Sequence, residues 1–160
     1  MKTPHSERIP ELPEGWPTNG RAAHSEAGTS RAEVVSFSED RHARGLRALQ
    51  EITGTSGHEV IESLRDIAPD FAEWIVDFSY GEVMTRPGLD RRSRQFATIA
   101  ALTALGNATP QLKVHIGGAL NVGCKPQEII EVILQMAVFA GFPAAINALN
   151  VAREVFNEQR

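Results

Sequence analysis

The chain has 160 residues, a net charge of −4 at neutral pH and 42% hydrophobic residues, enough for one domain with its own core. Lysine and arginine form no stripe that could follow a phosphate backbone, so no nucleic acid partner is expected. The single cysteine, Cys124, excludes an internal disulfide framework and fits a reducing, cytoplasmic compartment. No secretory signal is expected, and polar side chains interrupt the apolar run 129–148, so no membrane span is expected either.

Residues 1–38 are rich in proline, glycine and polar side chains. Such a segment buries too little apolar surface to offset its ordering entropy alone. It is predicted to be a flexible N-terminal extension, with an arm laid on a partner subunit and anchored by Trp16 as the alternative. The folded domain is predicted to span residues 39–160.

From residue 39 onward the apolar residues recur with helical spacing, and no segment alternates at period two. Asp90 is a predicted N-cap and Gly106 a predicted helix end, while Thr109 and Lys125 each precede a proline at a helix start. The chain is therefore predicted to be all-α. The expected helices are 39–52, 57–67, 69 to a turn at 86–88, 90–105, 109–122, 125–139 and 144–158.

Two of these helices, 96–105 and 129–140, are apolar on nearly every side. A helix that is apolar all round is buried all round. One central helix wrapped by the others would satisfy this, but two such helices favour a homo-oligomer that covers the surplus apolar surface.

His115 is the first candidate for chemistry, and it lies on or beside the apolar face of its helix. A lone histidine there is either a satisfied core residue or a functional group. Gly117 and Gly118 favour function, since each costs about 1 kcal/mol in a helix and needs a reason in packing or ligand approach.

Glu82 and Arg86 bracket the end of the third helix. They are either an exposed ion pair worth little or a site in which Arg86 binds a carboxylate and Glu82 carries a proton. Tyr80, Trp74 and Phe78 are expected to be core residues or pocket wall. The scattered histidines show no metal-binding spacing, so no metal site is expected.

Three stretches carry a resemblance to a known family. They are Tyr80 to Arg92 (YGEVMTRPGLDRR), Gln111 to Gly123 (QLKVHIGGALNVG) and Phe139 to Ala145 (FAGFPAA). Their order resembles the carboxymuconolactone decarboxylase family, the cysteine-poor branch of the alkyl-hydroperoxidase-D-like superfamily. The motifs span about half of the chain, and a weaker likeness reaches back to about residue 40.

The resemblance implies an alkyl-hydroperoxidase-D-like bundle of about six to seven helices, assembled as a trimer or hexamer with pockets near subunit contacts. It implies a carboxy-lyase that needs no cofactor and removes CO2 from 4-carboxymuconolactone in aromatic-compound degradation of the β-ketoadipate type. His115, Glu82 and Arg86 become the expected catalytic residues, and Tyr80, Met84 and Trp74 the expected substrate-binding residues.

At two places the sequence differs from the superfamily, and both differences bear on the expected function. Thiol-dependent members carry Cys-x-x-Cys just before the histidine, where this chain has no cysteine. They usually also carry a glutamate early in the preceding helix, where this chain has Gln95. A thiol peroxidase is therefore not expected, because that chemistry needs two thiols. Met84 replaces the tryptophan usual in the decarboxylases, which leaves the substrate open. The alternative function is a non-catalytic or differently specific ligand-binding oligomer.

Overall fold

The computed structural model describes residues 31–159, with side chains from residue 41 onward, and all regular structure in this range is helical. The predicted all-α class is confirmed for the described part of the chain. Most of the expected N-terminal extension, including Trp16, lies outside the described residues. The first helix begins at Arg31, upstream of the predicted start at Glu39. The division of the chain after residue 38 stays a prediction.

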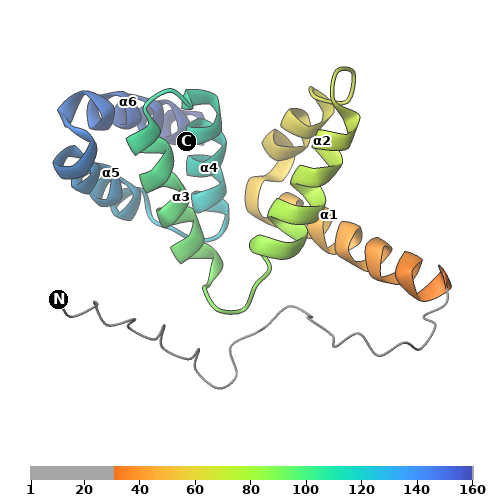
Figure 1. Cartoon of the computed structure of the whole chain (residues 1–160). Coiled ribbons are helices and arrows are strands. Elements are labelled where there is room, and N and C mark those ends of the chain that lie inside the picture. The colour runs from red at the N-terminus through yellow and green to blue at the C-terminus, as the bar shows by residue number, and fades with distance from the viewer. Residues whose placement is uncertain (1–30, 160) are drawn as a thin grey trace, which may run out of the picture.

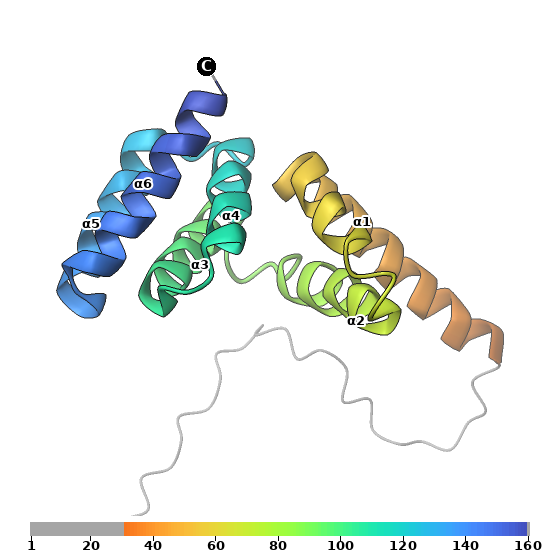
Figure 2. The ribbon, with the colours of Figure 1, turned by 90° about the horizontal axis from the view of Figure 1, so that it is seen from above.

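The helices form two groups that meet at α4 (Figures 1 and 2). α3, α4, α5 and α6 pack on one another, while α1 packs on α2 and on the π-helix η1, and α4 also contacts α1. The bounds are α1 Arg31–Glu62, α2 Pro69–Trp74, η1 Ile75–Val83, α3 Arg91–Leu105, α4 Thr109–Asn121, α5 Pro126–Ala140 and α6 Phe142–Glu158.

Each group has its own apolar core. Ile99, Ile116 and Ile133 are completely buried in the α3–α6 group. Leu49, Ile52 and Val76 fill the core of the other group. A pocket lies where the two groups face each other across α1, η1, α3 and α4.

Local signals in the sequence predicted several helix ends. Asp90 caps α3 through its side chain, which accepts a hydrogen bond of 3.0 Å from the Ser93 backbone amide. Gly106 ends the same helix with φ of 72°, a left-handed conformation that favours glycine. α4 begins at Thr109, and Ala108 takes the cap position one residue before it.

Gly54 breaks α1 rather than ending it. Its φ of 61° and ψ of −141° interrupt the helix, which then continues in a new direction to Glu62. Turns follow up to Ala68, so the second predicted helix ends at Glu62 instead of Ile67. The redirected half of α1 supplies one wall of the pocket.

The third predicted helix changes to π-helical pairing after Trp74. The Met84 amide donates to the Ser79 carbonyl five residues earlier, at 2.9 Å. The buried face is Ala72, Val76 and Tyr80. Trp74 and Phe78 are each 65% exposed and do not line the pocket, so the expectation that they are core residues or pocket wall is wrong for a single chain.

α1 and η1 approach closely through two glycines. A Cβ atom on Gly45 would lie 2.3 Å from the Val76 carbonyl oxygen, and one on Gly81 would lie 2.7 Å from the Arg41 carbonyl oxygen. Any larger side chain at these positions would push the helices apart. This contact fixes η1, and with it Tyr80, against α1.

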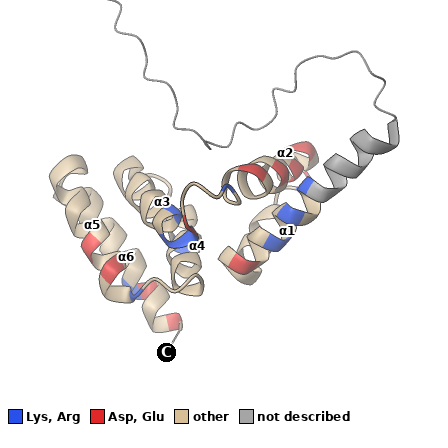
Figure 3. Cartoon of the chain, turned by 90° about the horizontal axis from the view of Figure 1, so that it is seen from below, with Lys and Arg blue, Asp and Glu red and all other residues tan. Residues whose placement is uncertain are grey.

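The corner between α5 and α6 exposes an apolar surface, here called the α5–α6 patch. It consists of Leu134, Val138, Phe139, Phe142 and Ile146. α5 carries few charges (Figure 3), and its inner face is buried at Ile129 and Ile133. The predicted all-round burial of this helix is therefore not achieved within one chain. None of the helices in residues 31–159 has both the length and the apolarity to cross a bilayer.

Candidate active site

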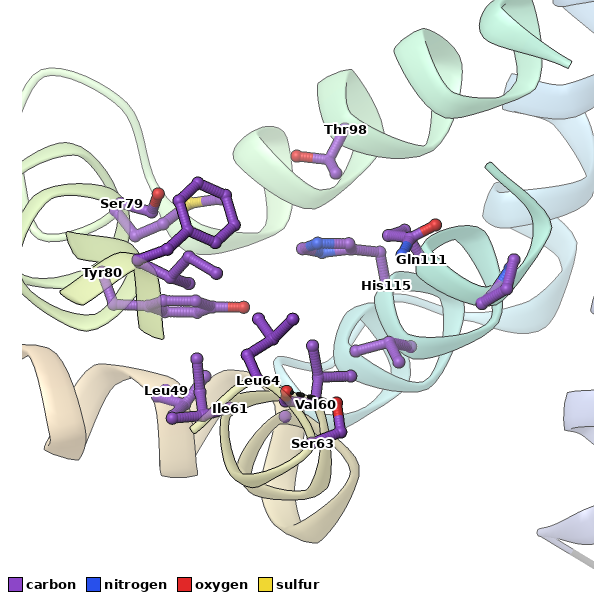
Figure 4. A pocket seen from close by; sticks show the side chains of 16 residues that line it. Leu49, Val60, Ile61, Ser63, Leu64, Ser79, Tyr80, Thr98, Gln111 and His115 are labelled. Atoms are coloured by element: carbon purple, nitrogen blue, oxygen red, sulfur yellow. Dashed lines mark hydrogen bonds between the residues drawn. The ribbon is translucent and has the colours of Figure 1, made fainter. Parts of the chain in front are cut away.

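The pocket between the two helix groups has a volume of about 680 Å³, within the range of small-molecule sites. Figure 4 shows its side chains converging from α1, η1, α3 and α4. The lining residues are Leu49, Gly57, Val60, Ile61, Ser63, Leu64, Phe71, Ile75, Ser79, Tyr80, Met84, Thr98, Pro110, Gln111, Val114 and His115.

His115 projects from α4 into this pocket (Figure 4). Burial lowers the pKa of its imidazole from 6.5 to about 4, because desolvation disfavours the charged form. The ring is therefore neutral near pH 7, with one nitrogen protonated and the other a hydrogen-bond acceptor. A neutral imidazole in an apolar pocket can donate to or accept from a ligand.

Gln95 is the polar partner of His115. It lies on α3, is 0% exposed, and its side-chain Oε1 is 3.0 Å from His115 Nδ1. Its Nε2 is buried without a hydrogen-bond partner among the described residues. Sequence reasoning noted Gln95 only as a replacement for glutamate and did not connect it with His115.

Gly118 makes room for this pair. A Cβ atom there would lie 3.1 Å from the Ile52 carbonyl oxygen and 3.5 Å from Gln95 Oε1. Of the two predicted reasons for this helical glycine, packing or ligand approach, the structure shows close packing. A Cβ atom on Gly117 would meet nothing within 4 Å, so packing within the described chain does not explain that second glycine.

Tyr80 faces His115 from the opposite wall (Figure 4). Burial raises the pKa of its phenol, and a hydrogen bond with the Thr53 side chain opposes this effect. Tyr80 is consequently a neutral phenol at physiological pH. Its hydroxyl can donate to or accept from a ligand in the pocket.

None of the pocket-lining residues carries a formal charge near pH 7, given neutral His115. Glu82 and Arg86 are not among the lining residues, although Met84 between them is. The Glu82 carboxylate lies 3.4 Å from Arg44, which also donates to the Gly81 carbonyl. The Arg86 carbonyl accepts a hydrogen bond of 3.0 Å from Arg94.

The six predicted site residues therefore divide into two sets. His115, Tyr80 and Met84 line the same pocket, whereas Glu82, Arg86 and Trp74 do not. The predicted roles of all six remain hypotheses.

Cys124 lies away from the pocket. It is 4% exposed, and burial raises the pKa of its thiol. A buried thiol with a raised pKa is a poor nucleophile. This environment agrees with the expectation that the chain is no thiol peroxidase.

One polar cluster was missed because its members are distant in sequence. His42 Nδ1 lies 2.7 Å from Asp77 Oδ1 and 3.3 Å from Glu73 Oε2, and the three groups are close enough to share one cation. The remaining carboxylate oxygens face Arg65 at 2.8 Å and Arg41 at 3.9 Å. This arrangement supports an ion-pair network that ties α1 to α2 and η1.

Over the described residues, fold and site together define an all-helical protein with a largely apolar pocket for a small molecule and one partly buried histidine at its wall. Comparison with known proteins identifies the family. The chain belongs to the carboxymuconolactone decarboxylase family, whose profile matches residues 69–154.

Three relatives cover most of the same region. A 4-carboxymuconolactone decarboxylase from Acinetobacter baylyi is 38% identical over 121 residues, 75% of this chain and 90% of that protein. An uncharacterized 15.0 kDa protein from Paracoccus denitrificans is 34% identical over 103 residues, 64% of this chain and 77% of that protein. A nitrosuccinic acid decarboxylase from Metarhizium robertsii is 31% identical over 118 residues, 71% of this chain and 80% of that protein.

Proposed function

We propose that this protein is a decarboxylase of a small carboxylated lactone, with 4-carboxymuconolactone as the first candidate and aromatic-compound degradation as its setting. The observation that carries the proposal is the neutral imidazole of His115, which projects into a pocket of small-molecule size. Family membership and two relatives named as decarboxylases support the reaction class.

The proposed substrate supplies its own electron sink, so the reaction needs no cofactor. When the bond to the carboxylate breaks, its electron pair moves through the ring double bond into the lactone carbonyl. CO2 leaves, and the ring becomes a dienolate that must then take up one proton at carbon. The protein must hold the substrate, stabilise the dienolate oxygen and deliver that proton.

His115 is the proposed donor to the dienolate oxygen, with proton delivery as its other possible role. A donor already aimed at an oxygen that gains charge contributes about 3 kcal/mol to the transition state. Tyr80, from the opposite wall, is a second neutral group that can hold the substrate. The lining is largely apolar, and hydrogen bonds in an apolar environment are stronger than in water.

Arg86 is the proposed carboxylate clamp, because a guanidinium can bind a carboxylate through two hydrogen bonds. It follows Met84, a pocket residue, by two positions, which would set it near the pocket edge. Glu82 is the proposed partner that sets the protonation of the site. Trp74 is proposed to contact substrate only in an assembly that brings it to a pocket.

The protein is proposed to be a cytoplasmic homo-oligomer, a trimer or a hexamer. The α5–α6 patch supports association, since Val138, Phe139 and Phe142 are 75% to 80% exposed and such a contiguous apolar surface marks an interaction site. Residues 1–38 are proposed to be an extension of the helical domain.

The uncharged pocket lining also favours an alternative, a ligand that carries less negative charge than a carboxylated lactone. Met84 also favours this alternative, because methionine adapts its shape where tryptophan would give a flat wall. In this alternative the scaffold binds a different small molecule, with or without turnover.

The test follows the ultraviolet absorbance of 4-carboxymuconolactone mixed with the purified full chain and no added cofactor. Catalytic loss of the substrate signal, with stoichiometric CO2, supports the proposal. No turnover by a folded protein would reject this substrate. Binding of carboxylated lactones in a ligand screen would then favour the alternative.

A further inference from the structure

The contact between the buried Gln95 and the partly buried His115 leaves one hydrogen-bonding group unexplained. The carboxamide of Gln95 is fully buried, and with Oε1 placed 3.0 Å from His115 Nδ1, its Nε2 has no partner among the described residues. A buried amide nitrogen has two N–H groups to satisfy. Orphaned buried N–H groups are rare because each loses its hydrogen bonds to water.

The two ends of a carboxamide have nearly the same shape, so their assignment follows from the hydrogen-bond network. If Oε1 faces Nδ1, the ring must carry its proton on Nδ1 and both amide N–H groups stay unpaired. If Nε2 faces Nδ1, one N–H is donated to the ring. The groups left over are then one N–H and the carbonyl oxygen, so one fewer N–H is left unpaired, and proteins bury an unpaired carbonyl oxygen more readily than an N–H.

The choice of orientation decides what His115 offers to a ligand. Because the ring is neutral, the nitrogen that accepts from Gln95 cannot also carry the proton. With Nδ1 as acceptor, the proton resides on Nε2, the nitrogen not engaged with Gln95. His115 then presents an N–H donor to the pocket rather than a lone pair.

We propose that Gln95 is a positioning residue: it donates Nε2–H to His115 Nδ1 and thereby holds His115 in the tautomer that points an N–H into the pocket. This inference deepens the proposed function and rests on it for its catalytic meaning. In that reaction the N–H meets the oxygen that becomes negative as CO2 departs. An ionised glutamate at residue 95 could only accept a hydrogen bond, so it would impose the opposite tautomer.

The tautomer can be observed without any substrate. Long-range ¹H–¹⁵N correlation spectra of the uniformly ¹⁵N-labelled full chain near pH 7 distinguish a protonated ring nitrogen from an unprotonated one. The His115 signals are assigned by their loss in His115→Asn. We expect an unprotonated Nδ1 and a protonated Nε2. The reverse pattern in the wild-type protein would overturn the proposal.

The variant Gln95→Glu tests whether Gln95 determines the tautomer of His115. We expect it to move the proton to Nδ1 or to produce the imidazolium, whereas Gln50→Glu, an exposed change on α1, leaves the spectrum of His115 unchanged. An unchanged His115 tautomer in folded Gln95→Glu would contradict the assignment of Gln95. Should Gln95→Glu fail to fold, the wild-type spectrum alone still decides the orientation.

The catalytic consequence is measured separately. On a substrate that the wild-type protein turns over, a Gln95→Glu protein in which the ring proton has moved to Nδ1 should have a kcat about 100-fold lower, the effect of losing one oxyanion donor, with a smaller change in KM. A variant with the reversed tautomer and full kcat would overturn the positioning role. If no substrate is turned over, the proposed function fails, while the spectrum still confirms or rejects the tautomer.

Discussion

Tyr80 and His115 face each other across the pocket, one from the π-helix η1 and the other from α4 (Figure 4). They come from different helix groups, so a ligand between them would contact both groups. Both groups are neutral near pH 7, because burial raises the pKa of the phenol and lowers that of the imidazole. A substrate held here would meet fixed dipoles instead of charges.

Tyr80→Phe removes one of these dipoles and keeps the aromatic wall. We expect kcat/KM on the proposed lactone to fall by about tenfold, the value of one neutral hydrogen bond to the ligand. Steady-state kinetics of the variant check this, with circular dichroism to confirm the fold. Unchanged kinetics would show that the hydroxyl serves only its contact with Thr53.

Arg86→Lys tests the proposed carboxylate clamp. Lysine keeps the charge but cannot form the two parallel hydrogen bonds of a guanidinium, so KM should rise by about tenfold or more while kcat changes less. Arg65→Lys changes a residue of the ion-pair network that does not line the pocket and is the matched control. Equal KM values in both variants and the wild type would remove Arg86 from the site.

The pKa of His115 predicts how stability depends on pH. Its folded-state pKa of about 4 lies below the value of about 6.5 expected in an unfolded chain. Between these values the unfolded chain binds more protons, so the free energy of unfolding falls as the pH falls. The contribution of this group is present above pH 6.5 and is lost on approaching pH 4.

Urea denaturation at pH 7 and pH 4.5 measures this effect. Acidification should cost the wild-type protein about 2 kcal/mol more than it costs His115→Gln, given roughly 1.4 kcal/mol per pKa unit. His58→Gln, a histidine outside the pocket lining, should behave like the wild type. Equal acid sensitivity of the wild-type protein and His115→Gln would contradict a depressed pKa.

Phe139→Glu tests the proposed assembly through the α5–α6 patch. Phe139 is 75% exposed within one chain, so the change should cost little stability in a protomer but should bury a charge in any interface. Light scattering after size exclusion should show a smaller species. Ile67→Glu, equally exposed but between α1 and α2, should leave the mass unchanged. An unaltered oligomer in Phe139→Glu would place the interface elsewhere.

Local signals in the sequence predicted the features that depend on neighbouring residues. Asp90 and Gly106 were identified as the ends of α3 because capping needs only residues within one turn. The family motifs led to His115, Tyr80 and Met84, which do line one pocket.

Long-range pairing could not be predicted in the same way. Gln95 and His115 are twenty residues apart on different helices, and no periodicity places one against the other. The π-helical register of η1 also escaped prediction, and η1 packs closely on α1 through Gly45 and Gly81, which are far apart in the sequence. That register buries Tyr80 and leaves Trp74 and Phe78 on the surface.

His115 is the residue on which the account depends, and turnover of 4-carboxymuconolactone by the wild-type protein, His115→Ala and His58→Ala is the most direct test. Removal of the donor should lower kcat by about 100- to 1,000-fold, with the fold intact by circular dichroism. His58→Ala should retain wild-type activity. Full activity in folded His115→Ala would contradict the account, because it would show that decarboxylation in this pocket does not need the imidazole.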